Sequence, residues 1–145
     1  MDKKKTRLLI FGVILPMTVA GIAYYILFPE VIFARRIDSL LGTGFHPLSA
    51  GEIYKNTLLR LLRYYAFDAV WAFSLTSSLY LIMGRGRGKV PAYLTVTVAM
   101  AVMSEAAQLF SLFPGTFDVW DIAVEIVGAL TGALIIKKQQ EVLNQ

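Results

Sequence analysis

Six side chains with carboxylate or amide oxygens lie within or beside long apolar stretches of the sequence. A charged Asp facing lipid hydrocarbon costs about 2.5–3.5 kcal/mol, so such residues are expected to face the interior of a helix bundle. Their oxygens can accept hydrogen bonds from amines or hydroxyls, or bind hard cations such as Mg²⁺ and Ca²⁺. The pattern therefore predicts one polar binding site, formed by Asp68, Glu105, Gln108, Asp118, Asp121 and Glu125.

The acids nearest the C-terminus share a helical phase with two glycines. Asp121, Glu125, Gly128 and Gly132 follow the spacing i, i+4, i+7 and i+11, and Asp118 precedes them by three residues. Residues at these intervals lie on one face of a helix, and small residues allow membrane helices to approach closely. The acids are therefore predicted to lie on the packed face of the last helix.

The composition places these residues in a membrane protein. Hydrophobic residues make up 57% and charged residues 17% of the 145 residues, there is no cysteine, and the mean hydropathy is +0.61. Soluble domains average about 45–50% apolar and about 25% charged residues, so a soluble enzyme is excluded. At about 20 residues per crossing, we expect an all-α bundle of four transmembrane helices in a single membrane domain, 1–145. The predicted spans are 8–28, 64–83, 91–113 and 119–136, with an outer loop over 29–63.

The predicted outer loop carries two local signals. The segment 31–41 alternates apolar and charged residues with a helical spacing, which is typical of an amphipathic helix lying in the membrane interface. Ser49 and Glu52 have the spacing of a capping box, which predicts a helix that begins there and continues through Arg60 and Arg63 into the second span.

The distribution of basic residues predicts the orientation. Lysines and arginines gather before the first span, in the loop 84–89 and after the fourth span. With four crossings these three segments share one side, and the positive-inside rule makes that side the cytoplasm. We therefore expect a multi-pass protein of a bacterial cell membrane with both termini in the cytoplasm. This orientation places the acids in the outer half of the bundle, with Glu105 the most deeply buried.

The C-terminal half resembles the VanZ-like family of small bacterial membrane proteins. The resemblance rests on Ser104-Glu105-Ala-Ala-Gln108, Phe117-Asp118-Val-Trp-Asp121 and Glu125-Ile-Val-Gly128-Ala-Leu-Thr-Gly132. Glu125 stands where the family usually has Asn, the arginine often found before the Asp turn is absent, and Asp68 matches only part of an upstream motif. The resemblance implies an envelope protein, and its name-giving member is associated with resistance to the glycopeptide teicoplanin.

Three hypotheses remain open at this point. In the first, the polar residues only cap and connect helices. In the second, the protein is a non-enzymatic accessory that binds an anionic lipid or a lipid-linked cell-wall precursor at the outer leaflet, with Arg60, Arg63, Arg35 and Arg36 meeting phosphate and the acids meeting amines, sugars or a cation. In the third, an intramembrane enzyme acts on lipid-linked phosphates through a carboxylate-held divalent metal.

The second hypothesis is preferred because no phosphotransfer or phosphatase motif is present. It needs no cofactor, and no catalytic or metal-binding residue is assigned. Nucleic acid is not expected as a partner. Gly128 and Gly132 are expected to contact another helix, either within the same chain or across a homodimer, and both alternatives remain open, because small residues join helices in both cases.

Overall fold

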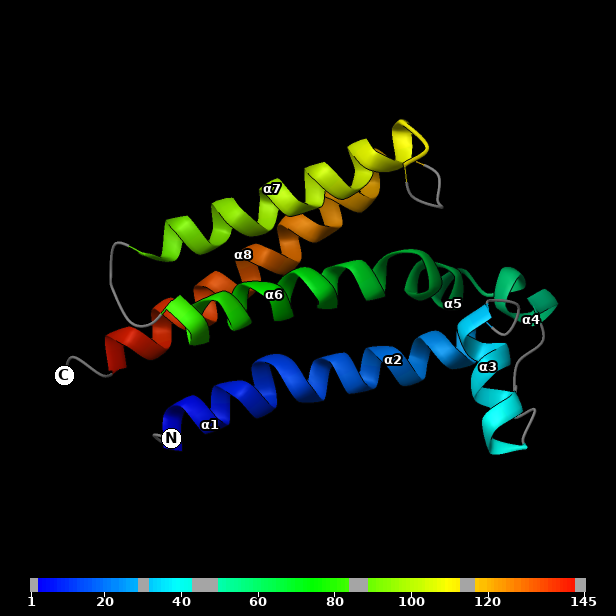
Figure 1. Cartoon of the computed structure of the whole chain (residues 1–145), viewed down its shortest axis with the longest axis horizontal. Coiled ribbons are helices and arrows are strands. Elements are labelled where there is room, and N and C mark those ends of the chain that lie inside the picture. Colours follow the sequence, from blue (N-terminus) through cyan, green and yellow to red (C-terminus); the bar gives the residue numbers. More distant parts are fainter. Residues whose placement is uncertain (1–2, 29–31, 43–49, 84–88, 113–116, 143–145) are drawn as a thin grey trace. The chain divides into compact units, whose positions relative to one another are not determined.

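The computed structural model describes residues 3–28, 32–42, 50–83, 89–112 and 117–142, and in these residues every regular element is a helix (Figure 1). The all-α prediction is therefore confirmed. In chain order the elements are α1 (Lys3–Leu9), the π-helix η1 (Ile10–Ile14), α2 (Leu15–Leu27), α3 (Ile32–Leu41), α4 (Ala50–Lys55), α5 (Thr57–Leu61), the π-helix η2 (Leu62–Ala66), α6 (Phe67–Met83), α7 (Val90–Leu109) and α8 (Val119–Val142).

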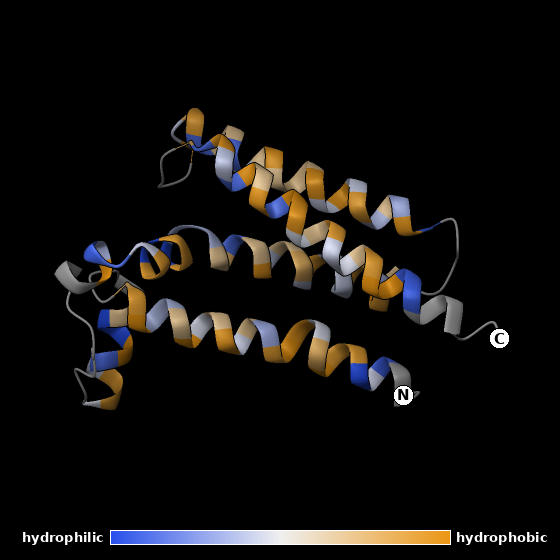
Figure 2. Ribbon diagram, turned by 180° about the vertical axis from the view of Figure 1, so that it is seen from behind, coloured by the Kyte–Doolittle hydropathy of each residue, from blue (hydrophilic) through white to orange (hydrophobic). Residues whose placement is uncertain are grey.

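Four helical stretches are long and apolar enough to cross a membrane, so the chain is a multi-pass membrane protein. Figure 2 shows hydrophobic residues along most of each long helix and hydrophilic residues gathered towards helix ends. The four stretches are Lys5–Leu27, Thr57–Met83, Val90–Leu109 and Val119–Lys138. They overlap all four of the predicted spans and differ from them at their ends.

The chain divides into two compact units, and each is described here by itself. Unit 1 comprises Met1–Met17 and Asp68–Gln145, and unit 2 comprises Thr18–Phe67. The single membrane domain expected from the sequence stays a prediction.

The first span accommodates a proline by a change of helix type. Pro16 has no N–H group, and its ring would clash with the carbonyl four residues earlier in a regular α-helix. Directly before it, the π-helix Ile10–Ile14 widens the turn, and the Leu15 N–H donates to the Ile10 carbonyl five residues back. The wider turn keeps this stretch helical from Lys3 to Leu27.

In unit 1, α7 and α8 run side by side, and α8 also packs closely against α6 (Figure 1). A Cβ atom added to Gly128 would lie 2.2 Å from the Ala69 carbonyl oxygen, and one added to Gly132 would lie 3.1 Å from that of Phe73. At Gly128 only glycine allows this approach, and at Gly132 a Cβ would be tight, which confirms that both glycines lie on a packed face. The homodimer expected through them stays a prediction, and within one chain both already face α6.

A second contact in unit 1 joins the first span to α6, since a Cβ on Gly12 would lie 3.1 Å from Ser77 Oγ. The apolar core lies where α1, α6, α7 and α8 come together. It consists of Leu8, Tyr80, Tyr93 and Ile136, each at most 4% exposed.

Two helix ends differ from the sequence predictions. The helix expected to continue into the second span is interrupted at Asn56, whose backbone is extended and whose side chain accepts hydrogen bonds from the Leu58 and Leu59 N–H groups. Asn56 is therefore the N-cap of a new helix, α5. The predicted cap at Ser49 lies outside the described residues.

The third span ends at Leu109, earlier than the predicted 113. Ser111 adopts a φ of +56°, its N–H donates to the Gln108 carbonyl, and the Leu112 N–H donates to the Ala107 carbonyl. These two bonds form a Schellman motif, which terminates a helix. Glycine usually occupies the position of Ser111, so no clear sequence signal marks this end of the helix.

Candidate functional site

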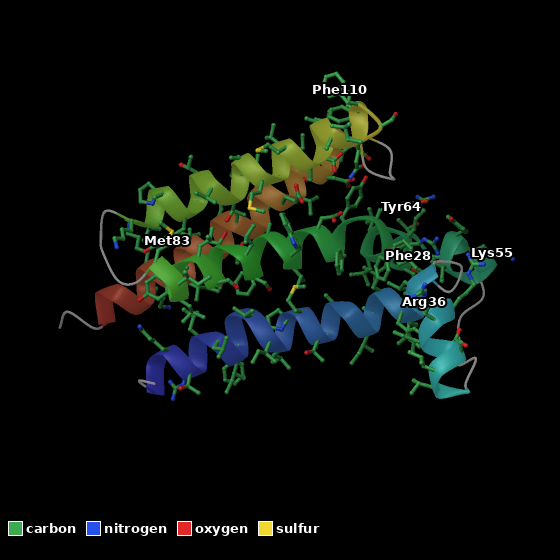
Figure 3. The ribbon with its side chains drawn as sticks, in the orientation of Figure 1. Phe28, Arg36, Lys55, Tyr64, Met83 and Phe110 are labelled. Carbon is green, nitrogen blue, oxygen red and sulfur yellow. The ribbon has the colours of Figure 1, made fainter. Side chains whose placement is uncertain are left out.

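The predicted acids of unit 1 lie on α6, α7 and α8, towards one end of the unit. Asp68 is the second residue of α6, Glu105 and Gln108 lie in the last turns of α7, and Asp121 and Glu125 lie in the first turns of α8. Figure 3 labels Met83 at the end of α6 and Phe110 at the end of α7, and these lie at opposite ends of unit 1. We call the Phe110 side the acidic end, formed by Asp68, Glu105, Gln108, Asp118, Asp121 and Glu125.

Glu105 connects α7 to the start of α8. Its side chain is 4% exposed, which makes it the most buried acid whose side chain the structure describes, as predicted. One oxygen, Oε1, accepts a hydrogen bond from Gln108 Nε2 at 3.2 Å, and the other, Oε2, accepts one from the Asp118 N–H at 3.0 Å. Both oxygens of Glu105 are therefore engaged within the protein.

Asp118 caps α8. Its Oδ1 accepts a hydrogen bond from the Trp120 N–H at 2.9 Å, and its own carbonyl accepts one from the Asp121 N–H at 3.2 Å. An N-cap aspartate satisfies N–H groups that have no partner within the helix. The hypothesis that the polar residues only cap and connect helices therefore explains the contacts of Asp118 and most of those of Glu105.

Glu125 is not explained in this way. It is 6% exposed, and its Oε2 is buried without a hydrogen-bond partner in the described part of the chain. Gly128, one turn further along α8, touches the backbone at Ala69, so Glu125 is held near Asp68 at the start of α6. An unsatisfied buried carboxylate oxygen is unfavourable, and such groups in native proteins call for a specific explanation.

The electrostatic surroundings of the acidic end are negative. Asp68 and Asp121 are half-buried. The charges that act through space on Glu125 are those of Asp68, Glu105 and Asp121, and all three are carboxylates. Like charges repel one another, so a cationic or hydrogen-bond-donating group among these side chains would be favourable.

The two predicted arginines, Arg60 and Arg63, belong to unit 2. Arg60 is exposed near the end of α5. Arg63 is 6% exposed, and its Nη1 donates to the Leu27 carbonyl at 2.6 Å while its guanidinium lies 4.3 Å from the centre of the Phe28 ring. Arg63 thus satisfies a carbonyl at the end of α2, where helix carbonyls lack intrahelical partners. Its predicted contact with phosphate stays a prediction.

Other contacts in unit 2 shape its exposed basic surface. The Tyr25 hydroxyl donates to the Asp38 carboxylate, which joins α3 to α2, and Ala34 of α3 is fully buried. In the same helix, Arg35 and Arg36 are exposed. These two arginines are available to an external partner.

The described residues contain no group of three or more His, Cys, Asp or Glu side chains that could hold a metal ion.

Sequence reasoning missed a polar contact in the middle of the bundle. Thr76 Oγ1 and Thr97 Oγ1 lie 3.0 Å apart and join α6 to α7, and both side chains are fully buried. Threonine inside a span is a weak signal, because its hydroxyl can instead bond to its own helix, as Thr131 does.

Comparison with protein-family models, curated proteins and solved structures found no match. The site geometry therefore carries the functional argument.

Proposed function

We propose that the protein is a VanZ-like membrane protein of the bacterial cell envelope, a non-enzymatic accessory that binds an anionic lipid or a lipid-linked cell-wall precursor at the outer leaflet. The single observation that supports this most is Glu125. Its buried oxygen without a partner, surrounded by other carboxylates, is suited to a ligand group that brings hydrogen-bond donors or positive charge.

In the proposal, the acids of the acidic end contact amine or hydroxyl groups of the ligand. Guanidinium groups bind phosphate by paired hydrogen bonds, so the exposed arginines of unit 2, taken by themselves, are candidates for contacts with lipid phosphate. The exposed candidates are Arg35, Arg36 and Arg60. Large apolar side chains are exposed along all four spans, as expected for helices that contact lipid. The binding site therefore lies next to lipids.

Non-enzymatic binding is preferred over catalysis because both oxygens of Glu105 are already engaged in holding Gln108 and the start of α8. A general base or a metal ligand requires an oxygen that can reach the reacting group. The link to teicoplanin-type resistance is part of this proposal and rests on the family resemblance alone.

Identification of lipids retained by the purified protein tests the proposal. We expect mass spectrometry of the wild type to detect an enriched anionic amphiphile. The variants Glu105→Gln and Asp121→Asn remove charge with little change of volume and should reduce its recovery. Thr131→Val is the matched control, because Thr131 is exposed on α8 and bonds only to its own helix at Val127.

A parallel measurement tests the resistance link. Expression of the wild type should raise the teicoplanin concentration that inhibits a susceptible host, and Asp121→Asn should not. If both charge-removing variants insert normally, retain the same lipids and protect the host equally, the acids are structural and the proposal is wrong.

A further inference from the structure

Helix α3 of unit 2 is held at the level where the first membrane span ends. The Tyr25 hydroxyl donates to the Asp38 carboxylate, and Tyr25 lies in the last turn of that span, which ends at Leu27. At a rise of 1.5 Å per residue, Tyr25 is within about 3 Å of the end of the span along the helix axis. Ala34 of α3 is fully buried as well, so α3 is packed within unit 2 beside the end of α2.

The direction of α3 places it along the membrane surface. Figures 1 and 2 show α3 running crosswise to α2, and α3 and the part of α2 from Thr18 onwards belong to the same unit. Transmembrane helices are tilted on average by only about 20° from the bilayer normal. A helix that runs crosswise to the end of a span therefore lies along the leaflet, at the level of the lipid headgroups.

The exposed charges of unit 2 are positive wherever the structure describes the side chain. They are those of Arg35, Arg36, Lys55 and Arg60. The acid of α3, Asp38, is half-buried and accepts the hydrogen bond from Tyr25. The exposed charged groups of α3 are thus two guanidinium groups, which are complementary to an anionic membrane surface.

A large exposed apolar side chain accompanies these arginines. Leu40 is 85% exposed, and it follows Arg36 by four residues, which places the two side chains on the same face of the helix. Burial of a leucine among acyl chains is favourable, and an arginine can lay its apolar stem along lipid while its guanidinium reaches phosphate. Basic and apolar groups combined in this way are typical of a helix that binds in the membrane interface.

We propose that α3 lies on the headgroups at the end of the first span and binds anionic lipids, with Arg35 and Arg36 on phosphate and Leu40 among acyl chains. The inference rests on the proposed function and deepens it, because it names the lipid class that unit 2 contacts and the helix that makes the contact. Each basic residue near an anionic surface contributes about 1 kcal/mol, which corresponds to about a fivefold enrichment of anionic lipid.

Quenching of a fluorophore on α3 by labelled lipids tests the inference in the full-length protein. The chain has no cysteine, so Leu40→Cys provides one site for a thiol-reactive fluorophore. The protein is reconstituted into phosphatidylcholine bilayers with increasing amounts of spin-labelled phosphatidylglycerol or spin-labelled phosphatidylcholine, and the nitroxide is near the top of the acyl chain. We expect phosphatidylglycerol to reach half-maximal quenching at an amount at least about fivefold lower than phosphatidylcholine does.

Substitutions in the same labelled protein ask whether the arginines of α3 are responsible. Arg35→Gln and Arg36→Gln should each lower the preference for phosphatidylglycerol, and together they should abolish it. Lys55→Gln is the matched control, because it removes an exposed positive charge of unit 2 outside α3 and should keep the preference. A fluorophore at Met83→Cys, at the end of α6, should not respond to the arginine substitutions.

Equal quenching by the two lipids at Leu40→Cys with both arginines present would overturn the inference, and this result requires no further variant to fold. Absence of quenching by either lipid would also overturn it, because α3 would then lie in water or against another protein. A double arginine variant that keeps the preference, or a Lys55→Gln variant that loses as much, would show that α3 is not the contact.

The proposed function and the role of α3 can fail separately. Retention of an anionic lipid that requires Asp121, without a preference at Leu40→Cys, would leave the proposed function intact and reject only the role of α3. A preference at Leu40→Cys without selective retention of any lipid by the purified protein would support the contact of α3 and reject the retained ligand.

Discussion

The two ends of unit 1 share the helices α6, α7 and α8, to which α1 adds Leu8 at the apolar end, and their side chains pack in opposite ways. At the apolar end, formed by Leu8, Tyr80, Tyr93 and Ile136, side chains fill the space, and the Tyr80 and Tyr93 rings meet edge to face with centroids 5.9 Å apart. At the acidic end, buried carboxylates face one another and Glu125 has an oxygen without a partner. The packing of the apolar end stabilises the fold. The buried carboxylates of the acidic end destabilise it, so their presence needs an explanation other than stability.

The difference indicates which end holds the bundle together. Dispersion contacts drive helix association in lipid, and the apolar end provides them. The acidic end is kept closed by close backbone contact at Gly128 and by the hydrogen bonds of Glu105. These features allow unfavourable charges to be held near one another without separation of the helices.

The largest expected effect is a loss of packing at the apolar end. Ile136→Ala should lower the free energy of unfolding by about 2–5 kcal/mol, because Ile136 is fully buried and its truncation leaves a cavity. Retained lipid should not change. The adjacent Ile135 is 40% exposed, so Ile135→Ala is the matched control and should have little effect in the same detergent titration. Equal losses for both would show that the apolar end is not the core.

A smaller loss is expected from overpacking beside the acidic end. Gly128→Ala should destabilise the protein by about 1–3 kcal/mol, since the new Cβ would lie 2.2 Å from a backbone oxygen that cannot move independently. Gly21→Ala is the control, because nothing lies within 4 Å of its added Cβ and alanine is the better helix former. A thermal unfolding midpoint for Gly128→Ala equal to that of Gly21→Ala would disprove the close approach of α6 and α8.

A still smaller change in stability distinguishes the capping role of Asp118 from the effect of its charge. Asp118→Ala should cost about 1 kcal/mol through loss of the bond to the Trp120 N–H, whereas Asp118→Asn should retain it and cost only a few tenths. Both variants remove the same charge, so their difference in unfolding free energy isolates the cap. If Asn is as destabilising as Ala, the charge of Asp118 is required and it is more than a cap.

The orientation of the two ends relative to the membrane can be tested with two substitutions that we do not expect to change stability. The chain contains no cysteine, so Phe117→Cys and Met83→Cys each introduce one reactive thiol. Phe117 is 42% exposed at the acidic end and Met83 is 44% exposed at the other. We expect an impermeant maleimide applied to intact cells to label the first and not the second. The reverse pattern would place the acidic end in the cytoplasm.

The sequence predicted that the acids gather at one end of the bundle, but it predicted few of the contacts that they make. Hydropathy locates four spans, and antiparallel neighbours necessarily bring the start of α6, the end of α7 and the start of α8 to one end. Helical phase correctly placed Gly128 on the packed face of α8.

What the sequence did not predict depends on contacts between distant residues or on unusual local residues. Arg63 reaches a carbonyl 36 residues away, and no local pattern indicates such a partner. Ser111 ends α7 in a conformation that usually requires glycine. The free oxygen of Glu125 follows from exact packing between α6 and α8, which spacing alone cannot supply.

Replacement of Glu125 by an apolar side chain of similar size tests most directly whether the acidic end serves binding at the expense of stability. Glu125→Met removes the buried oxygen and the repulsion without leaving a large cavity. We predict that its free energy of unfolding, measured in lipid-free detergent, equals or exceeds that of the wild type by up to about 1–4 kcal/mol, while recovery of the retained lipid is lost. A variant that is clearly less stable than the wild type and still retains the same lipid would contradict this account.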